Sequence, residues 1–249
     1  MTIITRVGGK YLLKEKVLAE FPPSDSYNIY AEPFVGAGHI FFNAPMVEVN
    51  VMNDLDPIIP QLYKDVKKLK EKEIEQIDLN PSKELFDFYK YTKFKTPLER
   101  TQQFLFLNKN SYSGKMQSYT PTRYYSKSNQ NIQNRLRETK EFFKKHKIII
   151  ENKDYSAILD EWDSPSTFFY LDPPYFETST SVAYSNTYLN PVELAERLKR
   201  IQGKFLLSYN DHPEIRRLFK GYKIKKVITK YGIQGGSSNE KKELLIKNY

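Results

Sequence analysis

Short runs of apolar and β-branched residues recur along this chain, and stretches with helical spacing separate most of them. The runs short enough for buried strands are Tyr27–Ala31, Val47–Met52, Lys147–Glu151, Thr167–Leu171, Lys204–Ser208 and Tyr222–Ile228. Helices are predicted over Lys10–Phe21, Pro57–Lys70, Tyr155–Trp162, Pro191–Gln202 and Pro213–Phe219. This alternation predicts an α/β fold in which helices cover a mostly parallel sheet.

Two regions depart from the alternation. At the C-terminal end, Tyr222–Ile228 and Glu243–Lys247 flank a Gly/Ser turn, which predicts an antiparallel hairpin. Between the second and third strands lies a long stretch, helical and then irregular. We therefore predict an inserted subdomain over residues 57–146 and one α/β domain formed by residues 1–56 and 147–249.

Composition narrows the class of protein. The chain has 249 residues and no cysteine, which excludes a disulfide scaffold and a thiolate metal site. Residues 1–6 lack the apolar run of a signal peptide, and no stretch approaches the ~18 apolar residues of a membrane span. We expect a cytoplasmic protein without membrane contact. Since His39, His146 and His212 show no metal-ligand spacing, we also expect no catalytic metal.

The positive charge is concentrated in one segment. The formal net charge is +9, and residues 101–150 contribute +8 of it through ten basic and two acidic residues. Tyrosines interleave with the basic residues there, which favours contact with nucleic acid. The alternative is a solvated helix face, because residues 129–147 have the pattern of an ordinary amphipathic helix with Ile132, Leu136 and Phe142/Phe143 facing inward. The irregular part, residues 109–127, is the predicted working loop.

A glycine motif stands where the first strand is expected to run into a helix. It reads EPFVGAGHIFF from Glu32, and its glycines permit a tight turn close to a ligand. The next strand ends in Asn53-Asp54, so a carboxylate should lie at its tip, where it can hold ribose hydroxyls. Together they predict a nucleoside-containing cofactor, whereas a turn glycine with a helix-capping Asp54 is the alternative. Phe41 fills the place of a third glycine, which disfavours a nicotinamide enzyme.

A second motif, Asp172-Pro173-Pro174-Tyr175, follows the strand Thr167–Leu171 directly. Two prolines stiffen the backbone and remove amide donors, which leaves the Asp172 carboxylate and the Pro173 carbonyl as acceptors. An amino group would satisfy both acceptors, and Tyr175 can stack on a planar ring. A plain Asp-Pro turn is the alternative.

The ordered motifs resemble one family, the Dam-like DNA adenine (N6) methyltransferases, which use S-adenosylmethionine. The order along the chain is that of the family's α arrangement: Gly8-Gly9-Lys10, Glu32 to Gly38, Asn53-Asp54, Asp172 to Tyr175, and Ser208 to Asp211. The resemblance implies a Rossmann-like methyltransferase sheet with a C-terminal antiparallel hairpin and a helical target-recognition subdomain. It implies methyl transfer to the amino nitrogen of a flipped-out adenine in duplex DNA.

The resemblance also implies roles for individual residues. Arg6 stands where the family usually has a tryptophan, and an arginine there can cover the site with its stem or pair with a carboxylate. The residues implied in catalysis are Asp172, Pro173, Pro174 and Tyr175; those implied in cofactor binding are Arg6, Lys10, Phe34, Gly36, Gly38, Asp54 and Asp172.

For DNA, the resemblance lies in residues 107–114, which are similar to the start of the family's target loop. It implies DNA contacts by Lys109, Tyr112, Ser113 and Arg123, with Arg123 on a guanine or on a phosphate. The longer pattern of GATC-specific members does not follow, so another target is allowed. The family resemblance also allows a separate cognate restriction endonuclease as a partner and association of the protein with the nucleoid. Alternatives are an amino-methyltransferase acting on RNA or on cytosine N4, a non-catalytic nucleic-acid-binding relative, and a nicotinamide dehydrogenase.

Overall fold

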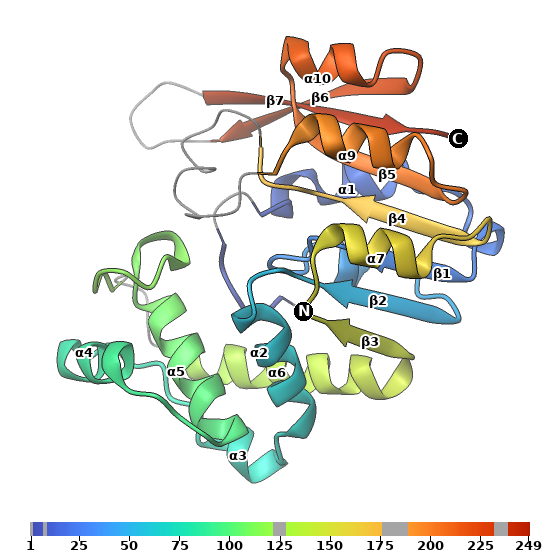
Figure 1. Ribbon diagram of the computed structural model, residues 1–249. Helices are drawn as coiled ribbons and strands as arrows, with labels where there is room; N and C mark the ends of the chain where they lie inside the picture. Colours follow the sequence, from blue (N-terminus) through green and yellow to red (C-terminus); the bar gives the residue numbers. More distant parts are fainter. Residues whose placement is uncertain (1, 7–8, 122–127, 176–188, 232–238) are drawn as a thin grey trace.

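A seven-stranded sheet runs through the computed structural model of the chain (Figure 1). The structure describes residues 2–6, 9–121, 128–175, 189–231 and 239–249. Parallel pairing joins β3, β2, β1, β4 and β5 in that order, and β7 lies antiparallel between β5 and β6. The strands are β1 (Ile29–Glu32), β2 (Val49–Asn53), β3 (Ile148–Glu151), β4 (Thr167–Leu171), β5 (Lys204–Asn210), β6 (Lys223–Tyr231) and β7 (Asn239–Lys247). The predicted α/β sheet and its C-terminal antiparallel pair are confirmed.

Helices cover both faces of this sheet. Along β4, Phe168 and Tyr170 enter one hydrophobic core while Phe169 and Leu171 enter the other, because successive side chains of a strand face opposite sides. One core is closed by α7 (Tyr155–Trp162), α9 (Pro191–Leu198) and α10 (Pro213–Leu218). The short α1 (Lys14–Leu18) lies on the other face (Figure 1). Burial on both faces explains the continuous apolar run of β4.

The helices between β2 and β3 gather at one side of the sheet (Figure 1). They are α2 (Ile58–Lys68), α3 (Glu71–Glu75), α4 (Lys83–Tyr91), α5 (Pro97–Lys109) and α6 (Ser128–Lys145). Ile132, Leu136 and Phe143 of α6 are buried, as its amphipathic pattern predicts. The Phe42 ring lies near the rings of Tyr63 in α2 and Phe143 in α6, so these helices share a core with the sheet. The division into two domains stays a prediction.

Two predicted helices differ in the structure. The stretch Lys10–Phe21 forms a 3-10 turn, η1 (Tyr11–Leu13), and then only the short α1, since Pro22 disfavours helical backbone at Phe21. The prediction of a helix directly after the glycine motif is wrong. Only the 3-10 turn η3 (Phe41–Asn43) follows, because Pro45 favours the extended conformation that Ala44 adopts, with φ −71 and ψ 151.

Candidate active site

Lys10 and Asp172 meet at the carboxyl end of β4. Asp172 follows the last residue of that strand, and Lys10 comes from the N-terminal segment, 162 positions earlier. The Lys10 ammonium donates a hydrogen bond to Asp172 Oδ1 over 2.6 Å. Lys10 is 5% exposed, so its charge is compensated within the protein. Burial raises the pKa of Asp172 to about 6, against the opposing effect of the Lys10 charge.

Tyr175, the last residue of the predicted tetrapeptide, lies close to the same lysine. The Lys10 nitrogen lies 4.7 Å from the centroid of the Tyr175 ring. The ring also stacks on Tyr209 of β5, with centroids 5.8 Å apart and planes 23° from parallel. Burial is the main cause that raises the pKa of the Tyr175 hydroxyl well above its ordinary value, so this hydroxyl is neutral at physiological pH. Between Asp172 and Tyr175, Pro173 is buried and Pro174 is half-buried.

The glycine motif lies at the carboxyl end of β1, beside the tip of β2. The Gly36 amide donates to Asp54 Oδ2 over 2.8 Å. This hydrogen bond joins the glycine motif to the acidic residue with which it was predicted to form a cofactor site. Gly36 and Gly38 have φ values of +51 and +71, which favour glycine. A Cβ on Gly38 would lie 2.7 Å from the Phe42 ring, whereas a Cβ on Gly36 would meet no atom of the described residues within 4 Å. Among those residues, open space therefore borders the loop at Gly36.

Carboxylates near the tip of β2 engage Arg6. Arg6 Nη2 lies 2.8 Å from Asp56 Oδ2, which is the pairing with a carboxylate that the sequence allowed. Burial raises the pKa of Asp54, and the nearby Arg6 charge opposes this. Asp54 Oδ1 accepts from the Asp56 amide over 3.0 Å, and Pro57 is the N-terminal cap of α2, so Asp54 does not cap that helix. The Phe34 ring stacks on Tyr155 at 5.4 Å between centroids.

The loop after α5 is tied to the N-terminal segment through Asn108. The Asn108 amide donates to the carbonyls of Thr5 and Gly114 over 2.8 and 3.1 Å, and its oxygen accepts from the Thr5 amide over 2.9 Å. This fixes the loop close to Arg6. Of the predicted DNA contacts, Tyr112 is 66% exposed and Ser113 is exposed.

The remaining predicted DNA contacts differ in their surroundings. Lys109 is half-buried, and burial lowers the pKa of its ammonium. Arg123 lies outside the described residues.

Two buried carboxylates at this site were not predicted. Glu32, the last residue of β1, accepts a hydrogen bond from the Tyr30 hydroxyl, and burial raises the pKa of Glu32 well above its ordinary value. Glu243 of β7 places Oε2 3.7 Å from Lys10 Nζ. Glu32 stood within the quoted glycine motif, so that motif was its signal. Glu243 follows two lysines, and nothing local distinguishes it from a surface residue.

The described ranges of the chain contain neither a metal-binding cluster nor a membrane-spanning helix. There, no cluster of three or more His, Cys, Asp or Glu side chains is arranged to hold a metal ion. Within the same ranges, no helix combines the length and the apolar character needed to cross a membrane.

Comparison with known proteins gives a consistent result. The family model of D12 class N6 adenine-specific DNA methyltransferases matches residues 7–233. A type II methyltransferase, M.MjaIII, of Methanocaldococcus jannaschii is 27% identical, with 97% of this chain and 96% of the relative covered. The DNA adenine methylase of Haemophilus influenzae is 27% identical over 96% of this chain and 89% of its own length. The corresponding Escherichia coli K12 enzyme is 23% identical, with 94% and 90% covered.

These matches agree with the predicted Dam-like family and with an enzyme that acts on DNA. They favour adenine N6 over the alternatives of RNA, cytosine N4 and nicotinamide chemistry. The chain belongs to the D12 class of N6 adenine-specific DNA methyltransferases.

Proposed function

We propose that the site at the carboxyl ends of β1 and β4 transfers a methyl group from S-adenosylmethionine to N6 of an adenine turned out of duplex DNA. The observation that carries this proposal is the half-buried Asp172 carboxylate at the end of β4, held by Lys10 over 2.6 Å, with the Tyr175 ring on the same lysine. An acceptor followed by two prolines and an aromatic ring suits a planar base that bears an amino group.

The residues around the β1 loop fit the cofactor. Open space borders Gly36, and Asp54 lies beside it as an acceptor for ribose hydroxyls. The half-buried Asp172 and buried Glu243 carboxylates near Lys10 suit a cationic ligand. When bound, S-adenosylmethionine supplies a methyl group on a sulfonium, which is a good leaving group. The residues that we assign to its binding are Arg6, Lys10, Phe34, Gly36, Gly38, Asp54 and Asp172.

The protein's own contribution is to orient the base and to accept hydrogen. The adenine N6 lone pair is delocalised into the ring, so this nitrogen is a poor nucleophile. Hydrogen bonds from its two N–H groups to the Asp172 carboxylate and the Pro173 carbonyl favour a more tetrahedral nitrogen. The same carboxylate can take the proton that N6 loses, because its pKa of about 6 lies near the working pH. Tyr175 would stack on the base and orient it.

We assign target recognition to residues 57–146 and cofactor binding and catalysis to residues 1–56 and 147–249. The exposed Tyr112 and the link from Asn108 to Thr5 support this, since they place a loop with an exposed aromatic near the N-terminal segment. In this proposal Lys109, Tyr112, Ser113 and Arg123 contact double-stranded DNA. The enzyme would act in the cytoplasm on nucleoid DNA. A cognate restriction endonuclease would act separately, as the type II names of several relatives suggest.

Replacing Asp172 tests the assignment. Asp172→Asn keeps the shape of the side chain but removes the charge, so we expect methyl transfer to fall by on the order of 10³-fold. S-adenosylmethionine affinity, measured by calorimetry, should change by only a few fold. Asp160→Asn is the matched control, because Asp160 lies on α7 and pairs with Arg197 at 3.1 Å. Turnover at the wild-type rate in Asp172→Asn would refute the assigned role.

A further inference from the structure

The Lys10 ammonium faces two carboxylates, and only one of them belongs to a motif. Asp172 Oδ1 lies 2.6 Å from Lys10 Nζ and Glu243 Oε2 lies 3.7 Å from it. Glu243 is 4% exposed. A buried carboxylate is costly for folding unless a charge or hydrogen bonds compensate it, so a second one in this position is unexpected from stability alone.

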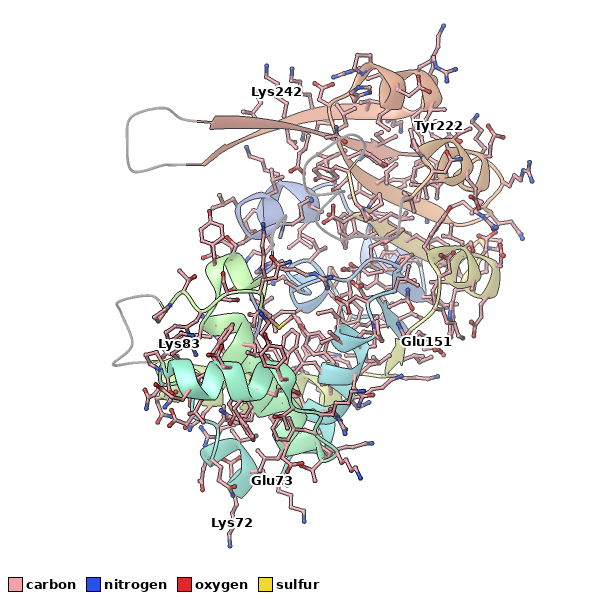
Figure 2. All side chains as sticks on the ribbon, turned by 60° about the vertical axis from the view of Figure 1, so that its left-hand side comes forward. Lys72, Glu73, Lys83, Glu151, Tyr222 and Lys242 are labelled. Carbon is pink, nitrogen blue, oxygen red and sulfur yellow. The ribbon has the colours of Figure 1, made fainter. Side chains whose placement is uncertain are left out.

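The sheet holds Glu243 rigidly. Glu243 is paired with Asn210 of β5 on one side and with Val227 of β6 on the other. The Asp211 amide adds a hydrogen bond to the Lys242 carbonyl over 3.1 Å. Lys242 points to the outer surface (Figure 2), and the next side chain along the strand turns inward, as the pleat requires. The Glu243 carboxylate is therefore fixed by a strand with partners on both sides.

We propose that Glu243 is a positioning residue for methyl transfer, holding Lys10 and Tyr175 so that the Asp172 carboxylate stays available to the adenine amino group. This proposal rests on the function proposed above. A lysine has three donors, so Lys10 can serve both carboxylates. With Asp172 alone, the ammonium would compete with the amino group for the same acceptor. With Glu243 present, Lys10 keeps a counter-ion while Asp172 accepts from the base.

Glu243 also acts on the aromatic residue of the tetrapeptide. The negative charge of the nearby Glu243 carboxylate contributes to the raised pKa of Tyr175. Lys10 lies over the same ring. One carboxylate from β7 thus acts electrostatically on both Lys10 and Tyr175.

Electrostatics supplies a signature of this arrangement. The charged and titratable groups that act on Asp172 or are shifted by it are Lys10, Glu243, Glu32, Tyr170 and Tyr175. The charge of Glu243 raises the pKa of Asp172, and that of Lys10 lowers it. Removing the Glu243 charge should therefore lower the pKa of Asp172, so the acid limb of the activity profile should move to lower pH.

The test compares Glu243→Gln, Glu243→Asp and a control, Glu20→Gln, in the full-length enzyme. Glu20 pairs with Lys225 and Lys247 of the same hairpin, at 2.5 and 2.9 Å, but not with Lys10. For Glu243→Gln we expect kcat to fall by roughly 10- to 100-fold with little change in the KM for DNA. We also expect the acid limb of the pH–activity profile to move to lower pH. Glu243→Asp keeps the charge and should keep the wild-type acid limb. Glu20→Gln should lower thermal stability only.

A second measurement does not depend on turnover. Carboxyl-¹³C NMR of Asp172, assigned with Asp172→Asn, follows its titration in wild type and in each variant without cofactor. A lower Asp172 pKa in Glu243→Gln than in wild type supports the proposal. An unchanged pKa, or a wild-type kcat in Glu243→Gln, overturns it. If wild type forms no N6-methyladenine, the proposed function fails, while the titration still tests Glu243.

Discussion

Asp172 combines a requirement for negative charge with a position that disfavours it. The ionised carboxylate accepts more strongly from the amino group than the neutral acid does, and only the ionised form can take up a proton, whereas burial favours the neutral acid. The hydrogen bond from Lys10 partly offsets this effect of burial. The balance leaves the pKa of Asp172 at about 6, so ionisation is nearly complete at neutral pH and is lost in mildly acidic solution.

We predict that the methyl-transfer rate falls as the pH drops through about 6, because protonation of Asp172 removes the base and weakens the acceptor. Single-turnover rates between pH 5 and pH 8, at saturating cofactor and DNA, measure this. Burial lowers the pKa of His39 to about 4, which places its titration below this limb. His212→Asn controls for His212, whose Nδ1 accepts from the Glu214 amide at the start of α10. An acid limb that disappears in this variant would contradict the assignment to Asp172.

At the scale of elements, the connection after β1 uses its two glycines for different purposes. Both have positive φ, so alanine at either position costs about 1 kcal/mol in backbone strain. A Cβ on Gly38 would also overlap the Phe42 ring, which packs in the core between the sheet and α2. A Cβ on Gly36 would enter the open space that we assign to the cofactor.

Gly38→Ala should therefore lower the melting temperature more than Gly36→Ala, since overpacking adds to the strain. Gly36→Ala should instead weaken S-adenosylmethionine binding beyond its effect on stability. Thermal denaturation and calorimetric titration of the two variants check both statements. Equal melting temperatures would show that Phe42 moves aside at little cost.

Elements with strong local patterns were predictable, and contacts between distant strands were not. Thr167–Leu171 was predicted with its observed limits because burial on both faces makes it apolar throughout. Asp172 could be predicted because it begins the motif that directly follows this strand. Glu243 depends on the pairing of β7 with β5 and on the path of Lys10, neither of which leaves a local signal. The helix predicted after Gly38 does not form, because Pro45 ends the segment after one 3-10 turn.

At the scale of the whole molecule, the basic segment divides into two parts. Residues 101–150 carry +8, yet many of these charges lie on α6. There Arg137 pairs with Glu71 at 2.6 Å, Lys144 pairs with Glu141, and Lys140 donates to the Leu69 carbonyl. That part has the solvated helix face that the sequence left open as an alternative. The charge near the proposed DNA contacts is smaller than the total suggests, and it includes the exposed Lys115 beside Tyr112.

Salt dependence can separate these two parts. If Lys115 contacts a phosphate, Lys115→Gln should reduce the slope of log affinity against log salt concentration by about 0.9 for duplex DNA. Lys145→Gln is the matched control, because Lys145 is also exposed but lies in the last turn of α6 and not in the loop after α5. Fluorescence anisotropy across a salt series measures both slopes. An equal reduction in the two variants would mean that the positive charge of residues 101–150 acts as a diffuse field and not through the loop after α5.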